Sequence, residues 1–212
     1  ECLVGSEMCI RDRFDRMNAL WTICPESEYI LQRTLECVRV CGENGIKTMI
    51  CHPTDGLVPP EVSRFGIENF AKIIQCGEEN GVDIAFENIQ LPQFLDVLFD
   101  KFGSLDNVKF CYDTGHENCF SKNTDCLTKF GNKLACLHIH DNDCWHDSHQ
   151  IPFSMSIDFD AVVKALKGIN YSGYFTLEAS SYLEAFTPET TQKGLCDLAA
   201  SAKRLSDMFE AL

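Results

Sequence analysis

The sequence of 212 residues has few basic side chains: 18 lysines and arginines stand against 32 aspartates and glutamates, for a formal net charge of −14 at pH 7. Proteins that bind nucleic acid use a basic surface to displace the counterions of the phosphates. No stretch of this chain resembles such a surface, so its composition argues against a nucleic-acid partner. An acidic chain of this kind can still bind metal cations.

Other absences concern cysteine spacing and long apolar runs. The chain has 13 cysteines but no Cys-x-x-Cys pair, which argues against a cysteine zinc knuckle. No run of membrane-spanning length and no secretory signal is recognisable, so we expect a cytoplasmic protein with reduced cysteines and no membrane partner. No phosphate-cradling glycine loop is recognisable either, and whether the substrate is phosphorylated stays open.

Residues 1–13 differ from the rest of the chain. They show no helical or strand period that continues beyond residue 13, and the string LVGSEMCIRDR resembles translated sequencing adapter. We therefore expect a non-native extension at 1–13, with Cys2 and Cys9, followed by a domain at 14–212 that is incomplete at its N-terminus. A disordered native terminus is the alternative.

From residue 25 onward, helical periods alternate with short apolar runs. Helices are predicted from Pro25, near Pro60 and Pro92, after Asp158 and from Thr187, because proline and capping residues mark helix starts. Strands are predicted at five runs: 46–51, 82–86, 108–112, 134–139 and 174–177. Repeated helix-to-strand units of this size indicate βα architecture with a parallel sheet, in which run 46–51 is an exposed edge.

Each predicted strand ends at or next to a residue that can bind a metal or move a proton: His52, Glu87, Asp113, His138 and Glu178. Right-handed crossovers place the C-terminal ends of parallel strands on one rim. A lone carboxylate after a strand is more often a helix cap. Carboxylates and an imidazole on consecutive strands, however, form a donor set for Mn²⁺, Mg²⁺, Co²⁺ or Zn²⁺, and a cation relieves the repulsion between the carboxylates.

These residues carry a family resemblance that runs from about Leu31 to the C-terminus. The strings AFEN, YDTGH, LHIHDND and YFTLE resemble the metal-binding motifs of the sugar isomerase/epimerase superfamily, the xylose isomerase-like TIM barrels of the AP endonuclease family 2 type. The loop DSHQIPFSMSIDF is also similar, with Ser156 where glycine is usual. The resemblance implies an α/β fold, a partial TIM (β/α)8 barrel with about five C-terminal strands of eight. It also implies one divalent ion, held by four ligands: Glu87, Asp113, His138 and Glu178.

The resemblance further implies an activity. We expect an isomerase or epimerase that acts on a keto sugar, a sugar phosphate or an inositol derivative by proton transfer next to a carbonyl. Glu87 and Glu178 would act as base and acid as well as ligands, while His116 and His140 would orient substrate hydroxyls or the enediolate. The expected partner is a small-molecule sugar, and whether the chain forms a homo-oligomer stays open.

Two alternatives remain. Zinc phosphodiesterases of the endonuclease IV type belong to the same superfamily and hold three zinc ions through additional histidines and an Asp-x-His pair. His52, His116, Asp147 and His149 match those additional positions, and His140 is a further candidate for metal or substrate. A further histidine that such endonucleases need is not found in residues 14–212. The second alternative is a non-catalytic, metal-stabilised sugar-binding module, since a fold alone does not fix a function.

Overall fold

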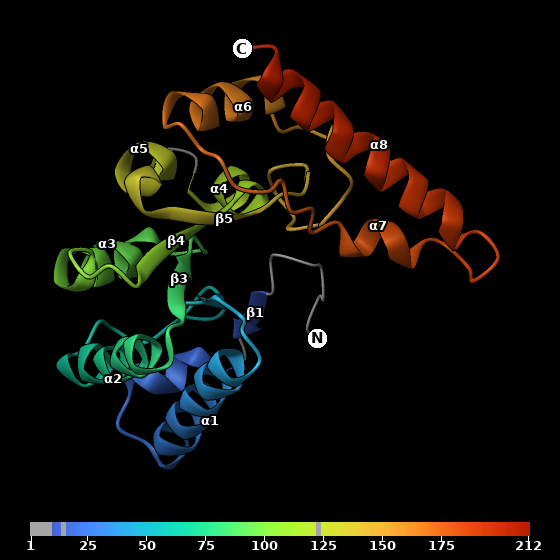
Figure 1. Ribbon diagram of the computed structural model, residues 1–212. Coiled ribbons are helices and arrows are strands. Elements are labelled where there is room, and N and C mark those ends of the chain that lie inside the picture. Colours follow the sequence, from blue (N-terminus) through green and yellow to red (C-terminus); the bar gives the residue numbers. More distant parts are fainter. Residues whose placement is uncertain (1–9, 14–15, 122–123) are drawn as a thin grey trace. The chain divides into compact units, whose positions relative to one another are not determined.

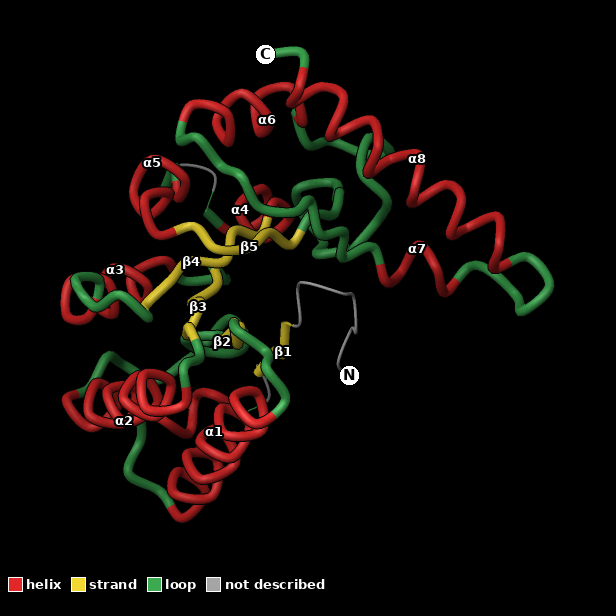
Figure 2. The backbone as a smooth tube through the Cα atoms, viewed as in Figure 1, coloured by secondary structure: helices red, strands yellow, loops and turns green. Residues whose placement is uncertain are grey.

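The computed structural model describes residues 10–13, 16–121 and 124–212, and the chain divides into two compact units, residues 1–111 and 112–212. Helices alternate with short strands in the first unit, whereas the second is mostly helix and loop (Figure 1, Figure 2). Among the described residues, every helix is too short or too polar to traverse a lipid bilayer.

The first unit contains parallel strands linked by helices. Its elements are β1 (Ile10–Arg13), the 3-10 helix η1 (Met17–Trp21), α1 (Pro25–Glu43), β2 (Thr48–Cys51), α2 (Arg64–Asn80), β3 (Asp83–Glu87), α3 (Pro92–Phe102) and β4 (Val108–Asp113), which ends in the second unit. The strands β1 to β4 pair in chain order, and every pair is parallel. This α/β arrangement is that of a half barrel, as expected for part of a TIM barrel.

The helices of the first unit follow the predicted pattern. Pro25 is the first residue of α1, and the face with Leu31, Leu35 and Val38 is buried, against α2, which lies beside it in Figure 1. The start predicted near Pro60 was wrong. The Ser63 side chain accepts a hydrogen bond from the backbone N–H of Gly66 (3.0 Å), so it caps α2 and the helix begins at Arg64.

Aromatic rings form the core of the first unit. The ring of Trp21 lies 5.1 Å from that of Phe70 and 5.0 Å from that of Phe94, between centroids. Phe70 also contacts Phe86 of β3, at 5.7 Å. The indole N–H of Trp21 donates to the carbonyl of Pro53 (2.7 Å), so the buried polar group of this side chain is satisfied.

The expected exposed edge at β2 was wrong. β1 pairs with it in parallel, from Ile10 opposite Thr48 to Arg13 opposite Cys51. An unpaired strand edge presents backbone donors and acceptors that another segment can satisfy. Here residues 10–13, within the predicted extension, supply those partners, while residues 1–9 lie outside the described residues.

The second unit has fewer strands. It contains α4 (Thr114–Phe120), α5 (Cys126–Phe130), the 3-10 helix η2 (Gly131–Lys133), β5 (Leu134–His138), α6 (Phe159–Gly168), α7 (Ser180–Glu184) and α8 (Thr191–Glu210). Asp158 caps α6, as predicted, by accepting a hydrogen bond from the N–H of Ala161 (3.1 Å). Lys167 of α6 donates to the carbonyl of Phe209 in α8 (3.0 Å), and the two helices lie close together in Figure 1.

Two predicted elements of the second unit differ from the structure. Run 174–177 is not a strand, because only Leu177 forms a ladder pair, an isolated parallel bridge to Ile139. The last helix begins at Thr191, not Thr187. Residues 187–190 instead form a turn in which the N–H of Thr187 donates to the Thr190 hydroxyl (2.9 Å). Such local side-chain hydrogen bonds compete with helix formation.

The contact between α2 and Trp21 generates a stability prediction. A Cβ atom at Gly66 would lie 2.1 Å from the Trp21 ring, so we expect Gly66→Ala to lower the free energy of unfolding by about 1–3 kcal/mol through overpacking. At Gly168, where a Cβ meets nothing within 4 Å, alanine should be neutral or slightly stabilising. Urea unfolding of both variants checks this. Equal stabilities would contradict the proposed role of the Trp21 contact.

Candidate metal centre

Three segments of the second unit lie side by side at their C-terminal ends. The Thr114 hydroxyl, directly after Asp113, donates to the carbonyl of His140 (2.8 Å) and accepts from its N–H (3.1 Å). The N–H of Glu178 donates to the carbonyl of Ile139 (2.9 Å). These hydrogen bonds hold the end of β4, the end of β5 and the segment that ends at Glu178 next to one another.

Three of the four predicted metal ligands meet at these ends. Ligand atoms of Asp113, His138 and Glu178 lie within 4.8 Å of one another, and His138 Nδ1 lies 3.2 Å from Glu178 Oε2. Asp113 and His138 are buried, whereas the side chain of Glu178 is 33% exposed. Two carboxylates and an imidazole at this spacing are suitable donors for a divalent ion.

The fourth predicted ligand, Glu87, ends β3 in the first unit and is 1% exposed. His52, directly after β2, approaches it with Nε2 3.1 Å from Glu87 Oε2. Glu87 is in register with Cys111 of β4, and Asp113 follows two residues later on that strand. In a strand, side chains two residues apart point to the same face.

A second cluster lies within the second unit. His116 of α4 places Nε2 3.1 Å from Asp147 Oδ2, and His149 Nε2 lies 3.5 Å from the same oxygen. Ligand atoms of all three lie within 4.8 Å of one another, so this group could also hold an ion. Sequence reasoning had matched these residues to additional metal positions, and the structure brings them together.

The charges of this second cluster depend on one another. Burial raises the pKa of Asp147, but hydrogen bonds from His116 and His149 outweigh burial and hold it well below its ordinary value. Burial lowers the pKa of His149, whereas the hydrogen bond to Asp147 and the nearby charge of Glu178 raise it to about 9. Without a metal, the pair is therefore a carboxylate and an imidazolium at neutral pH.

The loop that carries Asp147 and His149 is anchored by Asp141. This buried carboxylate accepts hydrogen bonds from the backbone N–H groups of Met155 (2.8 Å) and Ile157 (3.1 Å). The backbone of Asp141 also pairs with Gln150 in both directions, at 2.8 and 2.9 Å. Sequence reasoning gave Asp141 no role. Its position in the run of acidic and histidine residues from His138 to His149 gave no sign that it anchors the loop.

His140 lies behind the first cluster. Its side chain is fully buried, and its ring stacks on that of His149 with centroids 4.0 Å apart and planes 9° apart. The sequence predicted that His140 orients the substrate. That role stays a prediction. The buried ring has Nε2 3.1 Å from Asp113 Oδ1.

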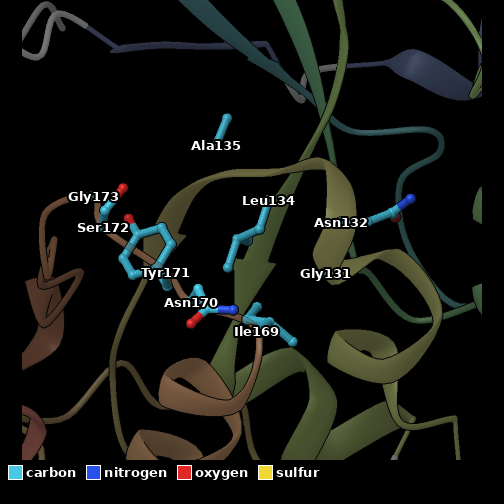
Figure 3. Close-up of a pocket in the computed structure, with 9 residues that line it drawn as sticks. All are labelled: Gly131, Asn132, Leu134, Ala135, Ile169, Asn170, Tyr171, Ser172 and Gly173. Atoms are coloured by element: carbon cyan, nitrogen blue, oxygen red, sulfur yellow. The ribbon is translucent and has the colours of Figure 1, made fainter.

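A cavity of about 330 Å³ lies at the opposite end of β5 (Figure 3). It is lined by Gly131, Asn132, Leu134, Ala135, Ile169, Asn170, Tyr171, Ser172 and Gly173. Catalytic groups of βα barrels lie at the C-terminal strand ends, where His138 stands. We therefore do not assign this cavity to the metal centre.

The chain matches a known protein family over most of its length. The family model described as xylose isomerase-like TIM barrel matches residues 23–201. The chain belongs to this family. The family suggested by its motifs is thus confirmed, together with the α/β class of its fold.

Two relatives of this family member are uncharacterized proteins. One, y4fM of Sinorhizobium fredii, is 39% identical over 103 residues, 45% of this chain and 32% of the relative. The other, MJ1311 of Methanocaldococcus jannaschii, is 27% identical over 182 residues, 75% of this chain and 61% of the relative. The chain therefore spans less than two thirds of the length of either relative.

Solved structures with the same fold include sugar epimerases. A D-tagatose 3-epimerase-like protein has a TM-score of 0.70 at 17% identity, over 93% of this chain and 78% of its own. The 3-keto-D-glucoside 4-epimerase YcjR from E. coli has a TM-score of 0.68 at 18% identity, over 90% and 78%. The IOLI protein with a bound zinc atom has a TM-score of 0.66 at 19% identity, over 88% and 74%.

The Asp147–His149 pair predicts a pH-dependent stability in the absence of metal. The raised pKa of His149 contributes stability that is complete below its ordinary value of 6.5 and is lost as the pH rises through about 9. The lowered pKa of Asp147 contributes stability that is present above its ordinary value of 3.8 and is lost in acid. In EDTA, Asp147→Asn should therefore lower the free energy of unfolding by about 1.5–3 kcal/mol near pH 5–6.

The loss should shrink when denaturant unfolding is repeated at about pH 10, where His149 is neutral. Asp143 provides a matched control, because its carboxylate pairs with His146 (2.8 Å) on the exposed part of the same loop. Asp143→Asn should change stability less, since water screens exposed pairs. A loss at Asp147 that is constant from pH 5 to pH 10 would contradict the pairing.

Proposed function

We propose that the protein is a divalent-metal-dependent isomerase or epimerase that acts on a keto sugar, a sugar phosphate or an inositol derivative. The observation that carries this proposal is the meeting of Asp113, His138 and Glu178 within 4.8 Å, at the ends of β4, β5 and the segment 174–177. The sugar epimerases among proteins of the same fold support the substrate class. The zinc atom named for the IOLI structure supports a metal.

We further propose that the protein holds a single ion, Mn²⁺, Mg²⁺, Co²⁺ or Zn²⁺, and that Glu87 is its fourth ligand. Its register with Cys111, two residues before Asp113 on β4, supports this assignment. The donors fit such an ion, because three carboxylates and one imidazole match its preference for oxygen and nitrogen. When bound, it supplies positive charge that polarises a carbonyl and stabilises an enediolate.

The protein's own groups then move the proton. Glu178 is partly exposed, so a substrate can reach its carboxylate, which we propose takes or returns the proton next to the carbonyl. Glu87 would serve as the second acid or base, with His52 Nε2 3.1 Å from one of its oxygens. His116 would orient substrate hydroxyls or stabilise the developing negative charge.

Substitution of the two glutamates tests the proton transfer. Glu178→Gln and Glu87→Gln keep an oxygen ligand and nearly the same volume but remove the carboxylate that accepts a proton. With Mn²⁺ or Co²⁺ bound, exchange of carbon-bound substrate hydrogen with deuterated solvent should slow by about 10²- to 10⁴-fold. The matched control is Glu184→Gln on α7, where the side chain is exposed, and exchange there should be unchanged.

NMR of a panel of ketoses, their phosphates and inosose derivatives measures the exchange. If the metal-loaded parent exchanges hydrogen in none of them, proton transfer is the wrong reaction. Retained binding of metal and sugar in that case would favour a non-catalytic sugar-binding module.

One observation favours a second candidate, a zinc phosphodiesterase of the endonuclease IV type. The cluster of His116, Asp147 and His149 offers donors for an additional ion, and Asp147 Oδ1 accepts no hydrogen bond from the described residues. The net charge of −14 opposes binding to DNA.

Metal content separates the two candidates. For an isomerase we expect one tightly held ion per chain by elemental analysis, no nicking of abasic DNA, and the same metal content in Asp147→Asn. For the phosphodiesterase, about three zinc ions and cleavage at abasic sites are expected, both reduced in Asp147→Asn, because a carboxamide is a weaker zinc ligand than a carboxylate.

A further inference from the structure

The ring of His140 is held in one place from two sides. A Cβ atom at Gly115 would lie 1.9 Å from its Cε1 atom, so the backbone at the start of α4 rests directly against the ring and only glycine fits there. On the other side, the ring stacks on His149 at 4.0 Å. A side chain fixed this closely can direct a hydrogen bond with little loss of entropy.

The acidic neighbours of this ring belong to both candidate metal clusters. His140 Nε2 lies 3.1 Å from Asp113 Oδ1 and 3.6 Å from Asp147 Oδ1. Neither ring nitrogen is aligned for a hydrogen bond with any residue in the described ranges. A fully buried imidazole without a hydrogen bond loses its contacts with water and gains none in return, which costs free energy. A carboxylate that turns one oxygen toward Nε2 and accepts a hydrogen bond removes this cost.

We propose that His140 is a positioning residue whose Nε2–H group donates to Asp113 and fixes that carboxylate for metal binding. The backbone N–H of His116 already donates to the same oxygen, Asp113 Oδ1 (2.6 Å). Two donors on one oxygen hold the carboxylate from the protein side, the arrangement that orients metal ligands. The inference rests on the proposed function, which makes Asp113 a ligand.

The role differs from contact with substrate. His140 is fully buried, so a sugar could reach it only after neighbouring side chains moved. A hydrogen bond to Asp113 needs no such movement. The hydrogen bond to Asp113 also explains why residue 140 is a histidine. An apolar ring of the same shape would pack there without a desolvation cost.

Variants at His140 test the inference. His140→Phe keeps a flat ring but removes both nitrogens, while His140→Gln places an amide N–H near the position of Nε2. His146→Phe is the matched control, since its imidazole is 79% exposed on the same loop. Co²⁺ binding is measured by calorimetry and by the visible absorption of the bound ion, and unfolding in EDTA shows which variants fold.

We expect His140→Phe to weaken Co²⁺ binding by about 10- to 100-fold and to change the absorption spectrum. His140→Gln should recover part of the affinity and His146→Phe should match the parent. A purely structural role predicts no rescue by glutamine and no spectral change. Unchanged affinity and spectrum in folded His140→Phe would overturn the positioning role alone.

A parent that binds no Co²⁺ would overturn the proposed metal function, and the positioning role with it. If His140→Phe does not fold, the comparison of His140→Gln with His140→Asn decides, because the shorter amide places its N–H near Nδ1, away from Asp113. Tighter Co²⁺ binding by the glutamine variant is expected. Equal affinities would overturn the inference.

Discussion

The second unit depends on the compensation of negative charge at the ends of its strands. Asp113 is fully buried, and Glu178 and Asp147 are partly buried around it. Carboxylates in such a place repel one another unless cations or donors surround them. Imidazoles supply this compensation, with His138 against Glu178 and His116 against Asp147. The same carboxylates and imidazoles could hold a metal ion.

The positions of the proposed ligands along the chain could be predicted from sequence because strand ends are local signals. An apolar run that stops at a charged side chain locates Glu87, Asp113 and His138 without knowledge of any contact, and the structure ends β3, β4 and β5 at those residues. Helix starts at Pro25 and Asp158 were predictable for the same reason, since a cap acts within a few residues.

What could not be predicted depends on distant partners. Residues 10–13 have no strand period, yet the open edge of β2 pairs with them. Run 174–177 has a strand-like composition but obtains only one bridge, at Leu177. Strand formation requires a neighbour, which no local pattern reports. The burial of His140 also depends on distant residues. These are Gly115, 25 positions earlier, and the ring of His149, nine positions later.

Ser156 fastens the loop that carries the second cluster. Its hydroxyl donates to the carbonyl of Asn142 (2.7 Å), and Asn118 of α4 donates to that hydroxyl (3.1 Å). With the carboxylate of Asp141 bonded to residues 155 and 157, the loop is fastened on both sides of Asp147. Its side chains are therefore placed before any ligand arrives, and binding there does not have to supply the free energy of ordering the loop.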